Sequence, residues 1–416
     1  MNLVLASREA VCDMVEVHAS AVPWDGMVLA SSCDKSIPAQ LKAAARLDIP
    51  TIFIPGGSMR NGPEMTTSLV AGDISLRQKR KDGITADEIR EYKITGCPSV
   101  GACTFLGTAS TMQCMAEALG LALPGSALVP ATMRDILEYA RIAGRTIMEL
   151  AENKITPSMI ITPAAMRNAI VVHSAIGGST NAAIHLPSIA REAGFELPIE
   201  LFDEINHIIP HLCNVNPSGQ HLTESFWFAG GVPMIQWMLR DYLDLDVMTS
   251  TGKSLGENLE IIHKDRFFER NVRYLHNYGL KREEVIFPSE KVKENGSIAI
   301  LKGNLEKKGI NFLLGTKVTK VQDSVVYYEV DGKESSVESD KILLSIGRRA
   351  NTTNIGLEKL SLATERGAIK VDEICQTNVP GVYAVGDVNG KSMLAHTAYR
   401  EAEVAVNTIL GKKDIM

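Results

Sequence analysis

Long hydrophobic runs, a basic excess and a leader pattern are all missing from this sequence. No apolar stretch approaches the roughly 18 residues of a bilayer-spanning helix, so no membrane partner is expected. The formal net charge is -6, which leaves no basic excess to neutralise the phosphates of a nucleic acid. The first residues lack a charged segment followed by a long apolar core, so we do not expect a secretory signal there.

The sequence also contains no G-x-G-x-x-G turn, the phosphate-binding fingerprint of dinucleotide-binding folds. Its seven cysteines are an odd number scattered along 416 residues, which fits a reducing cytoplasm better than a disulfide framework. What is present is an ordinary globular composition, with 45% hydrophobic residues. The length allows two or three domains, each with a sizeable core.

A short apolar run at residues 27–30 has the pattern of a buried strand, and Pro38 interrupts the pattern after it. The predicted strand delivers Cys33, Asp34 and Lys35 together at its carboxyl end, where α/β sheets usually carry their sites. A thiolate suits iron, whereas a carboxylate suits magnesium. A lysine that loses its proton can react with carbon dioxide to form a carbamate, a further oxygen ligand. The alternative is that Cys33 is a small buried hydrophobe and the other two form a solvated ion pair.

The stretch GMVLASSCDKSIPAQ (residues 26–40) resembles the Cys-Asp-Lys signature of the dihydroxy-acid and aldonate (sugar-acid) dehydratase family. ARLDIPTIFIPGGSM (residues 45–59) is similar to the family's second strand and Gly-Gly turn, and residues 96–131 are similar to its second cysteine block. GTASTM (residues 107–112), and alanine rather than glycine after Pro38, resemble the sugar-acid branch more than the amino-acid-biosynthetic branch. The resemblance runs from about the first residue to about residue 305.

Cys103 lies in a glycine-rich turn before a helix that we expect from about Thr108 to Leu121. A helix N-terminus lowers the pKa of a nearby thiol, so Cys103 can be a ready thiolate. Cys97 begins the turn and Cys114 lies in the helix body, so both are weaker candidates, and a C-x5-C pair can also be two unrelated thiols. Cys12 lies inside a helical pattern at residues 3–20 and fits a core residue.

The resemblance implies an iron–sulfur cluster, [2Fe-2S] or [4Fe-4S], with Cys33 and Cys103 among its ligands. It also implies Mg²⁺ held by Asp34 and by carbamylated Lys35, which makes Lys35 the catalytic candidate. An intact member removes water from a 2,3-dihydroxy acid or sugar acid to give a 2-keto-3-deoxy acid. In the family, a third cluster cysteine, the remaining acidic magnesium ligands and a catalytic serine lie in segments that this sequence does not contain. We therefore expect poor retention of the cluster.

A second glycine pair stands at the end of an amphipathic segment, before Ser179, Thr180 and Asn181. Free N–H groups and hydroxyls at a helix start suit an anion, and the GGSTN context resembles the family's substrate-side loop. Ser179 and Thr180 are therefore substrate-binding candidates, with a simple N-cap as an equal alternative. His173 and His185 fit packed or capping histidines at least as well as functional ones.

From about residue 306 the sequence resembles dihydrolipoamide dehydrogenase, above all in TNVPGVYAVGDV (residues 377–388) and MLAH (residues 393–396). We expect strands at residues 309–314, 341–346 and 382–385. Gly347 ends one strand where backbone can approach a nucleotide, and Asp387 is placed to accept a hydrogen bond from a flavin ribityl hydroxyl. Ala395 begins the helix that would follow the cofactor. The resemblance implies FAD and NAD, but the C-x4-C redox disulfide and the C-terminal His-Glu dyad are missing.

Three hypotheses follow. The chain is an iron–sulfur and magnesium dependent hydro-lyase of the dehydratase type, a flavin and nicotinamide oxidoreductase, or an inactive joined product of two genes. Resequencing the DNA across the codons near Leu305 tests the third.

We expect an α/β fold in which a layered parallel or mixed sheet forms a metal-binding domain over residues 1–260. Residues 261–305 would connect it to a small α/β remnant at residues 306–416. A homodimer is expected from both families, and the resemblance to the dehydratases implies a sugar acid or dihydroxy acid as the substrate.

Overall fold

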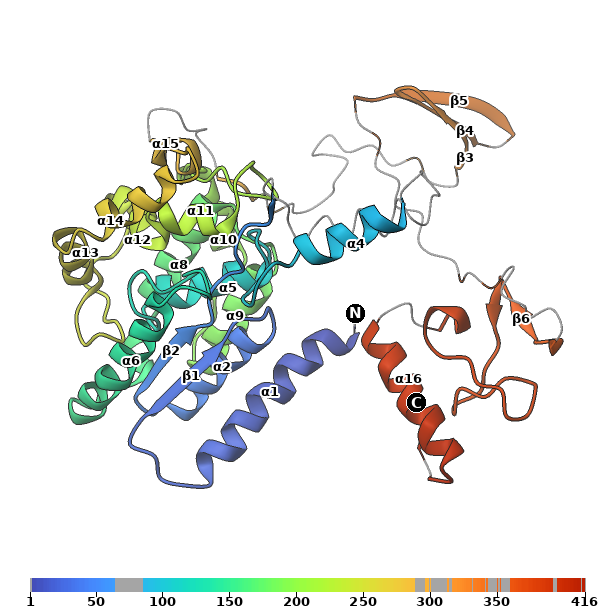
Figure 1. Ribbon diagram of the computed structural model, residues 1–416, viewed down its shortest axis with the longest axis horizontal. Helices are drawn as coiled ribbons and strands as arrows, with labels where there is room; N and C mark the ends of the chain where they lie inside the picture. The colour runs from blue at the N-terminus through green and yellow to red at the C-terminus, as the bar shows by residue number, and fades with distance from the viewer. Residues whose placement is uncertain are drawn as a thin grey trace. The chain divides into compact units, whose positions relative to one another are not determined.

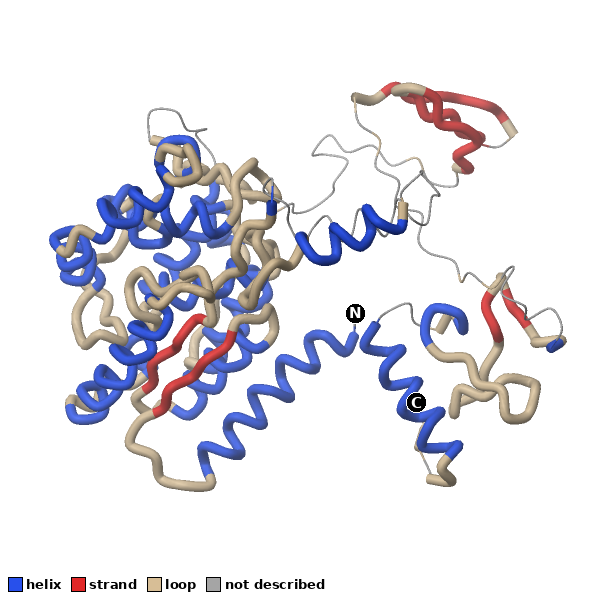
Figure 2. Tube along the Cα trace, viewed as in Figure 1, coloured by secondary structure: helices blue, strands red, loops and turns tan. Residues whose placement is uncertain are grey.

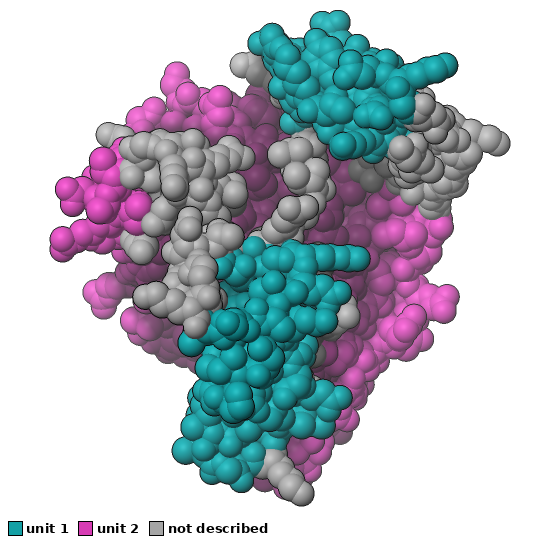
Figure 3. All heavy atoms as spheres, turned by 90° about the vertical axis from the view of Figure 1, so that its right-hand side faces the viewer, with its two compact units in different colours: residues 1–3, 302–416 teal, residues 4–301 magenta. Residues whose placement is uncertain are grey.

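The structure, a computed structural model, describes residues 2–63, 85–288, 296–298, 316–330, 332–340, 360–391, 395–412 and 414–415, together with residues 300, 313, 342, 350 and 352. The chain divides into two compact units, residues 4–301 and residues 1–3 with 302–416, which have different colours in Figure 3. The fold is a mixture of helices and small sheets, as Figure 2 shows. Within these residues, no helix is both long enough and apolar enough to cross a membrane.

The strand predicted at residues 27–30 is confirmed, and it belongs to a βαβ unit. β1 (Met27–Ser31) and β2 (Thr51–Pro55) pair in parallel, in a register that sets Met27 against Thr51 and Ser31 against Pro55. A parallel pair needs a long crossover, and α2 (Ser36–Leu47) supplies it. Figure 1 shows the two strands side by side. Both strands therefore end at the same edge, which places the segment after Ser31 beside the segment after Pro55.

Several helices of the larger unit pack around one central helix. α8 (Pro163–Ile176) is buried along most of its length and packs against α5, α9, α10 and α12, so it forms the centre of the core. α6 packs against both strands. The other elements of this unit are α1 (Asn2–Ser20), α4 (Ala86–Thr95), α5 (Thr108–Ala118), α6 (Asp135–Glu152), α7 (Pro157–Ile160), α9 (Ala182–Glu192), α10 (Glu200–Ile208), α11 (Thr223–Phe228), α12 (Gly231–Met238), η2 (Arg240–Tyr242), α13 (Leu255–Lys264), α14 (Phe267–His276) and α15 (Arg282–Val285).

An ion-pair network attaches α1 to α2 and α9. Arg46 of α2 donates to Glu192 of α9 at 2.9 and 3.1 Å, and to Asp13 and Glu16 of α1 at 2.8 and 2.6 Å. Buried Lys42 pairs with Glu192 at 3.3 Å and also with Glu9 of α1. The network thus joins three helices that are distant in sequence.

Arg46→Met should lower the free energy of unfolding by about 1–2 kcal/mol at neutral pH, because it removes ion pairs to three carboxylates, two of them partly buried. The hydrogen bond from Arg46 is the main cause that lowers the pKa of Glu192 below 4.5. A depressed carboxyl pKa stabilises the fold above that value and loses its effect as the pH falls through the folded pKa. The difference from the wild type should therefore shrink in urea unfolding near pH 3. Arg141→Met, which removes an exposed pair with Glu138, is the matched control. A loss for Arg46→Met no larger than this control contradicts the prediction.

Among its described residues, the smaller unit contains two separate sheets. β3 (Lys317–Gln322), β4 (Val325–Val330) and β5 (Lys333–Glu338) form an antiparallel sheet whose outer strands are exposed. β6 (Thr364–Glu365) and β7 (Ala368–Ile369) form a two-stranded antiparallel sheet. η6 (Gly386–Asn389) and α16 (Ala395–Ile409) pack together.

The strand predicted at residues 382–385 was wrong. This segment has only an isolated bridge from Tyr383 to Gln376. Gly381 at φ +78° and Gly386 at φ +77° turn the chain on both sides, so only a short piece is left between two turns. Residues 313 and 342 are not strand, and the rest of the strands predicted at residues 309–314 and 341–346 lies outside the described residues.

Candidate functional site

The Cys33–Lys35 segment forms the turn between β1 and α2, as the sequence predicted. The Cys33 N–H donates to Ser36 Oγ at 3.3 Å, and that hydroxyl donates to the Cys33 carbonyl at 3.2 Å, so the start of α2 fixes the backbone of the cysteine. The Cys33 side chain is exposed. Lys35 Nζ pairs with Asp34 Oδ2 at 3.1 Å, and their side chains are 16% and 39% exposed. A thiol, a carboxylate and an amine therefore share one turn. Within the ion pair, the Lys35 side chain is more buried than the Asp34 side chain.

The segment after β2 lies against this turn. The Gly56 N–H donates to the Ser31 carbonyl at 3.0 Å. A Cβ on Gly56 would lie 2.2 Å from Ser32 Oγ, so only glycine fits at this approach. The exits of the two parallel strands are thus in direct contact.

The same segment also contacts the loop that carries Cys103. The Ala102 N–H donates to the Gly57 carbonyl at 2.9 Å, and the Met59 N–H donates to the Ala102 carbonyl at 2.8 Å. Gly101, at φ +120°, allows this approach, since a Cβ there would lie 2.4 Å from the Ser58 carbonyl carbon. Residues 56–59 therefore connect the Cys33 turn on one side with the Cys103 loop on the other.

The predicted helix at Thr108 is confirmed as α5, and its start is bonded to the GGSTN loop. Thr108 Oγ1 and Ser179 Oγ are 2.9 Å apart, and Asn181 Nδ2 donates to Thr108 Oγ1 at 2.8 Å. The Ser179 N–H donates to Thr111 Oγ1 at 2.9 Å. Asn181, the N-cap residue of α9, makes no side-chain cap bond, and Thr180 is exposed. The loop therefore makes hydrogen bonds to α5 that are not needed to cap α9. Substrate binding by Ser179 and Thr180 stays a prediction.

His173 is a packed histidine, as one of the two sequence interpretations held. It is fully buried on α8, and its Nε2 lies 2.9 Å from the Ser179 carbonyl, so Nε2 carries the proton and donates. Burial lowers the pKa of His173 to about 4, with the bond to Ser179 acting weakly in the other direction. His173 is thus a neutral hydrogen-bond donor that positions the Ser179 backbone.

Acid should destabilise the fold through His173. A histidine pKa lowered to about 4 from about 6.5 means that the unfolded chain binds the proton more tightly, so stability falls as the pH drops from about 6.5 to about 4. The expected loss at pH 4 is about 3 kcal/mol for this residue. His173→Gln retains an N–H donor without the titration, and should flatten the acid limb of urea unfolding free energy against pH. An unchanged acid limb would contradict this assignment.

His185 lies on the buried side of α9. Its Nδ1 is 3.0 Å from Arg8 Nη1 of α1, and both side chains are buried. Burial, then the charges of Lys35 and Arg8, lower the pKa of His185 to about 4. The Cys33–Lys35 turn leads directly into α2, and α2 packs against α9, so the turn begins the helix that lies beside that of His185.

The seven cysteines separate by exposure. Cys33 and Cys97 are exposed and Cys103 is partly exposed, whereas the other four are buried: Cys12, Cys114, Cys213 and Cys375. Burial raises the pKa of Cys12 to about 11 and that of Cys114 well above 9. The core interpretation of Cys12 is confirmed, and Cys114 is a poor source of thiolate at neutral pH.

The donor set of this region is partial. Within the described ranges, no group of three or more His, Cys, Asp and Glu side chains is placed to hold a metal ion. In the smaller unit, Asp387 is exposed at the start of η6 and Ala395 begins α16, as predicted for the helix. Gly347 lies outside the described residues. Flavin binding by these three residues stays a prediction.

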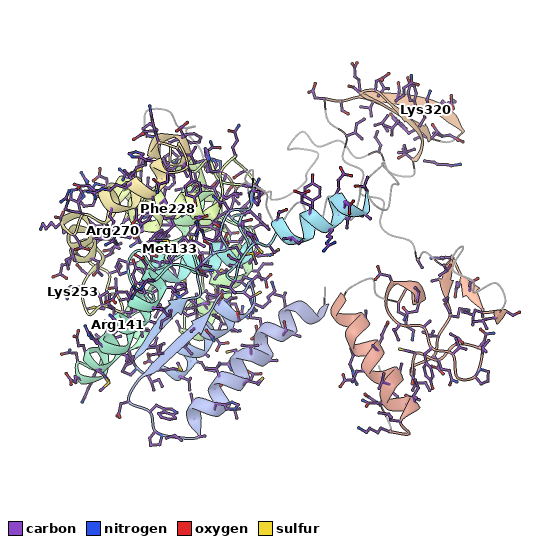
Figure 4. All side chains as sticks on the ribbon, in the orientation of Figure 1. Met133, Arg141, Phe228, Lys253, Arg270 and Lys320 are labelled. Carbon is purple, nitrogen blue, oxygen red and sulfur yellow. The ribbon has the colours of Figure 1, made fainter. Side chains whose placement is uncertain are left out.

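A separate cavity of about 460 Å³ lies on another face of the larger unit. Its walls come from α6, α13, α14 and adjacent loops, and include Tyr139, Ile142 and Phe267 as apolar parts. Lys253 and Arg270, both labelled in Figure 4, also line it. None of the predicted site residues lines this cavity.

Several residues that shape the region were missed in the sequence. Gln113 both donates to and accepts from the Gly57 backbone at 3.1 Å, and thereby fixes the glycine turn on α5. Arg8 was missed although a signal existed, since it interrupts the apolar face that Val4, Val11 and Val15 define on α1. No local pattern announces Gln113, because its partner is 56 residues away.

Comparisons with known proteins give two family matches. The family described as dihydroxy-acid/6-phosphogluconate dehydratase N-terminal matches residues 1–258. The family described as pyridine nucleotide-disulphide oxidoreductase matches residues 284–402.

Curated relatives named dihydroxy-acid dehydratase agree with the first match. The chain is 39% identical to that of Nitratidesulfovibrio vulgaris over 313 residues, which cover 74% of this chain and 54% of the relative. It is 40% identical to that of Syntrophobacter fumaroxidans over 314 residues, with the same shares. The protein of Desulfatibacillum aliphaticivorans is 35% identical over 356 residues, 83% of this chain and 60% of its own length. The chain thus spans little more than half the length of these relatives.

Proposed function

The chain belongs, through residues 1–258, to the dihydroxy-acid/6-phosphogluconate dehydratase family, and we propose that it is a hydro-lyase that removes water from a 2,3-dihydroxy acid. One observation carries this proposal: residues 56–59 hold the Cys33 turn and the Cys103 loop on either side of the shared strand edge. Two accessible thiols and a carboxylate–amine pair then lie on adjacent segments. Because the relatives extend well beyond this chain, the activity of an intact enzyme is part of the proposal.

The side chains present fit the family's cofactors in kind. Cys33 and Cys103 are the soft donors that iron prefers, and Asp34 is a hard donor for Mg²⁺. Carbamylated Lys35 would add a second hard donor. An iron–sulfur cluster and Mg²⁺ supply Lewis acidity toward the departing hydroxyl and the substrate oxygens. The remaining ligands must come from outside the described residues.

The chain's own groups provide the rest of the site. The Thr108 and Ser179 hydroxyls lie 2.9 Å apart at the start of α5, where free N–H groups favour a carboxylate. His173 donates to the Ser179 carbonyl, which positions the backbone of the loop without a substrate. We propose that this corner binds the acid group of the substrate. Three further proposals accompany this function. GTASTM suggests that the substrate is a sugar acid. The protein is also proposed to be a homodimer and to contain a fully layered sheet.

The test uses the full chain, reconstituted without oxygen in iron, sulfide and Mg²⁺. Iron and sulfide content, a charge-transfer absorption band and 2-keto acid formation from a branched dihydroxy acid and from a five-carbon aldonate are measured together. Faster turnover of the aldonate favours the sugar-acid branch. A protein that retains no iron and forms no keto acid contradicts the hydro-lyase proposal.

A second function has specific support from the match over residues 284–402. It is a flavin-dependent oxidoreductase with FAD and NAD as cofactors. Flavin absorbance in the purified protein would favour it. A chain that binds neither iron nor flavin fits the third hypothesis, an inactive joined product.

A further inference from the structure

The His185 ring has a fixed tautomer. Arg8 has only N–H donors, so His185 Nδ1, 3.0 Å from Nη1, must be the acceptor. A neutral imidazole that accepts at Nδ1 carries its hydrogen on Nε2. The Arg8 side chain, itself buried, thus sets His185 as a donor that points away from α1.

That donor has no acceptor. His185 is 1% exposed, and its Nε2 has no hydrogen-bond partner within the part of the chain that the structure describes. Leaving a buried N–H unpaired costs as much as losing a hydrogen bond, so nearly all such groups in proteins are satisfied. His173, on the neighbouring helix, shows the usual case, since its Nε2 donates to the Ser179 carbonyl. The free donor of His185 indicates an acceptor that the described part of the polypeptide does not provide.

Lys35 is the N-cap residue of α2, and α2 packs against α9, the helix that carries His185. The Lys35 ammonium and the Arg8 guanidinium both act on His185, and Asp34 is the nearby counter-charge. The Lys35 side chain is 16% exposed, so solvent screens it only in part. If Lys35 carried a negative group, its positive effect on His185 would be replaced by a negative one, and the Nε2 donor would gain an oxygen acceptor.

We propose that His185 is a positioning residue for Lys35, and that its Nε2–H binds an oxygen of a carbamate formed on that lysine. The proposal rests on the hydro-lyase function proposed above. The Lys35 amine, after it releases one proton to water, bonds through nitrogen to the carbon of CO₂. One C=O electron pair moves onto oxygen and a second proton leaves to water, so the product is Lys–NH–COO⁻ with no oxidant or reductant. Arg8, through His185, then holds this carboxylate beside Asp34.

The test measures the carbamate itself on the full chain. Protein is equilibrated with ¹³C-bicarbonate, the adduct is trapped by alkylation, and mass spectrometry locates it on the peptide that contains Lys35. His185→Phe keeps the ring volume without the donor, and should lower the trapped fraction by roughly tenfold or more, as expected for losing a bond to a charged group. His185→Gln retains an N–H donor and should recover most of the adduct. His263→Phe, on α13 and stacked on Trp237, is the matched control.

A measurement on the wild-type protein gives a second readout that does not depend on whether the variants fold. The ¹⁵N spectrum of the histidine rings should show His185 as the Nε2–H tautomer, with a resonance that shifts when bicarbonate is added. Equal adduct in His185→Phe and wild type, or an unmoved His185 resonance, overturns the proposal. A carbamate that needs His185 in a chain without dehydratase turnover leaves the inference standing and refutes only the proposed function. Dehydratase turnover together with an adduct that does not depend on His185 refutes this inference and leaves the proposed function standing.

Discussion

Trp227→Ala should lower the free energy of unfolding by about 3–5 kcal/mol, the usual cost of emptying a large aromatic site in a core. Trp227, on α11, is 1% exposed. Its ring meets Phe267 edge to face at 6.0 Å and Phe228 at 5.4 Å. Its Nε1 donates to the Gly125 carbonyl at 2.8 Å, and the truncation leaves that buried acceptor unpaired. Urea unfolding followed by far-ultraviolet circular dichroism measures the effect without relying on tryptophan fluorescence.

Trp237→Ala is the control for this prediction. Trp237 is only partly buried and stacks on His263 at 4.3 Å, with Arg240 over its face at 5.0 Å. Its removal loses stacking and a partly solvated cation–π contact, for which we expect about 1–2 kcal/mol. Equal losses for the two substitutions would contradict the prediction, because the deeper burial of Trp227 would then make no difference.

Local patterns in the sequence predicted much of the larger unit. The apolar run before Cys33 folds into β1 as expected, because the strand period is a local property. The helix after Gly107 begins at Thr108, where glycine and threonine give a start signal. The candidate cysteines and Asp34 were therefore placed correctly relative to their own elements.

What joins these elements could not be predicted in the same way. The bonds from residues 56–59 to both cysteine segments depend on the packing of loops that are far apart in sequence, and a Cβ at Gly56 or Gly101 would prevent them. The contact of Arg8 with His185 spans 177 residues. The apolar segment at residues 382–385 misled for a related reason, since a strand needs a neighbour as well as an apolar pattern, and turns at both ends left it with one bridge. Local sequence patterns predict where helices and strands form, whereas tertiary contacts decide whether the strands pair.

Replacing the two candidate thiols should have the largest functional effect. We expect Cys33→Ser and Cys103→Ser each to lower iron and sulfide retention after anaerobic reconstitution at least tenfold, and keto acid formation with it, since a hydroxyl is a hard, weakly acidic ligand that iron–sulfur clusters rarely accept. Iron content, sulfide content and the visible absorption band check this. Both residues lie at exposed or partly exposed loop positions, so folding should be preserved in both variants.

Cys97→Ser is the decisive comparison. Cys97 is as accessible as Cys33 and lies just before the same glycine-rich turn as Cys103, so it shares their exposure and local sequence. It differs in its surroundings, because the bonds that reach the Cys33 turn through residues 56–59 start from Ala102 rather than from the backbone of Cys97. If proximity across the strand edge selects the ligands, Cys97→Ser retains the wild-type iron content while the other two variants lose it. If exposure alone makes a cysteine bind iron, all three variants lose it equally, and the assignment of Cys33 and Cys103 as a pair is wrong.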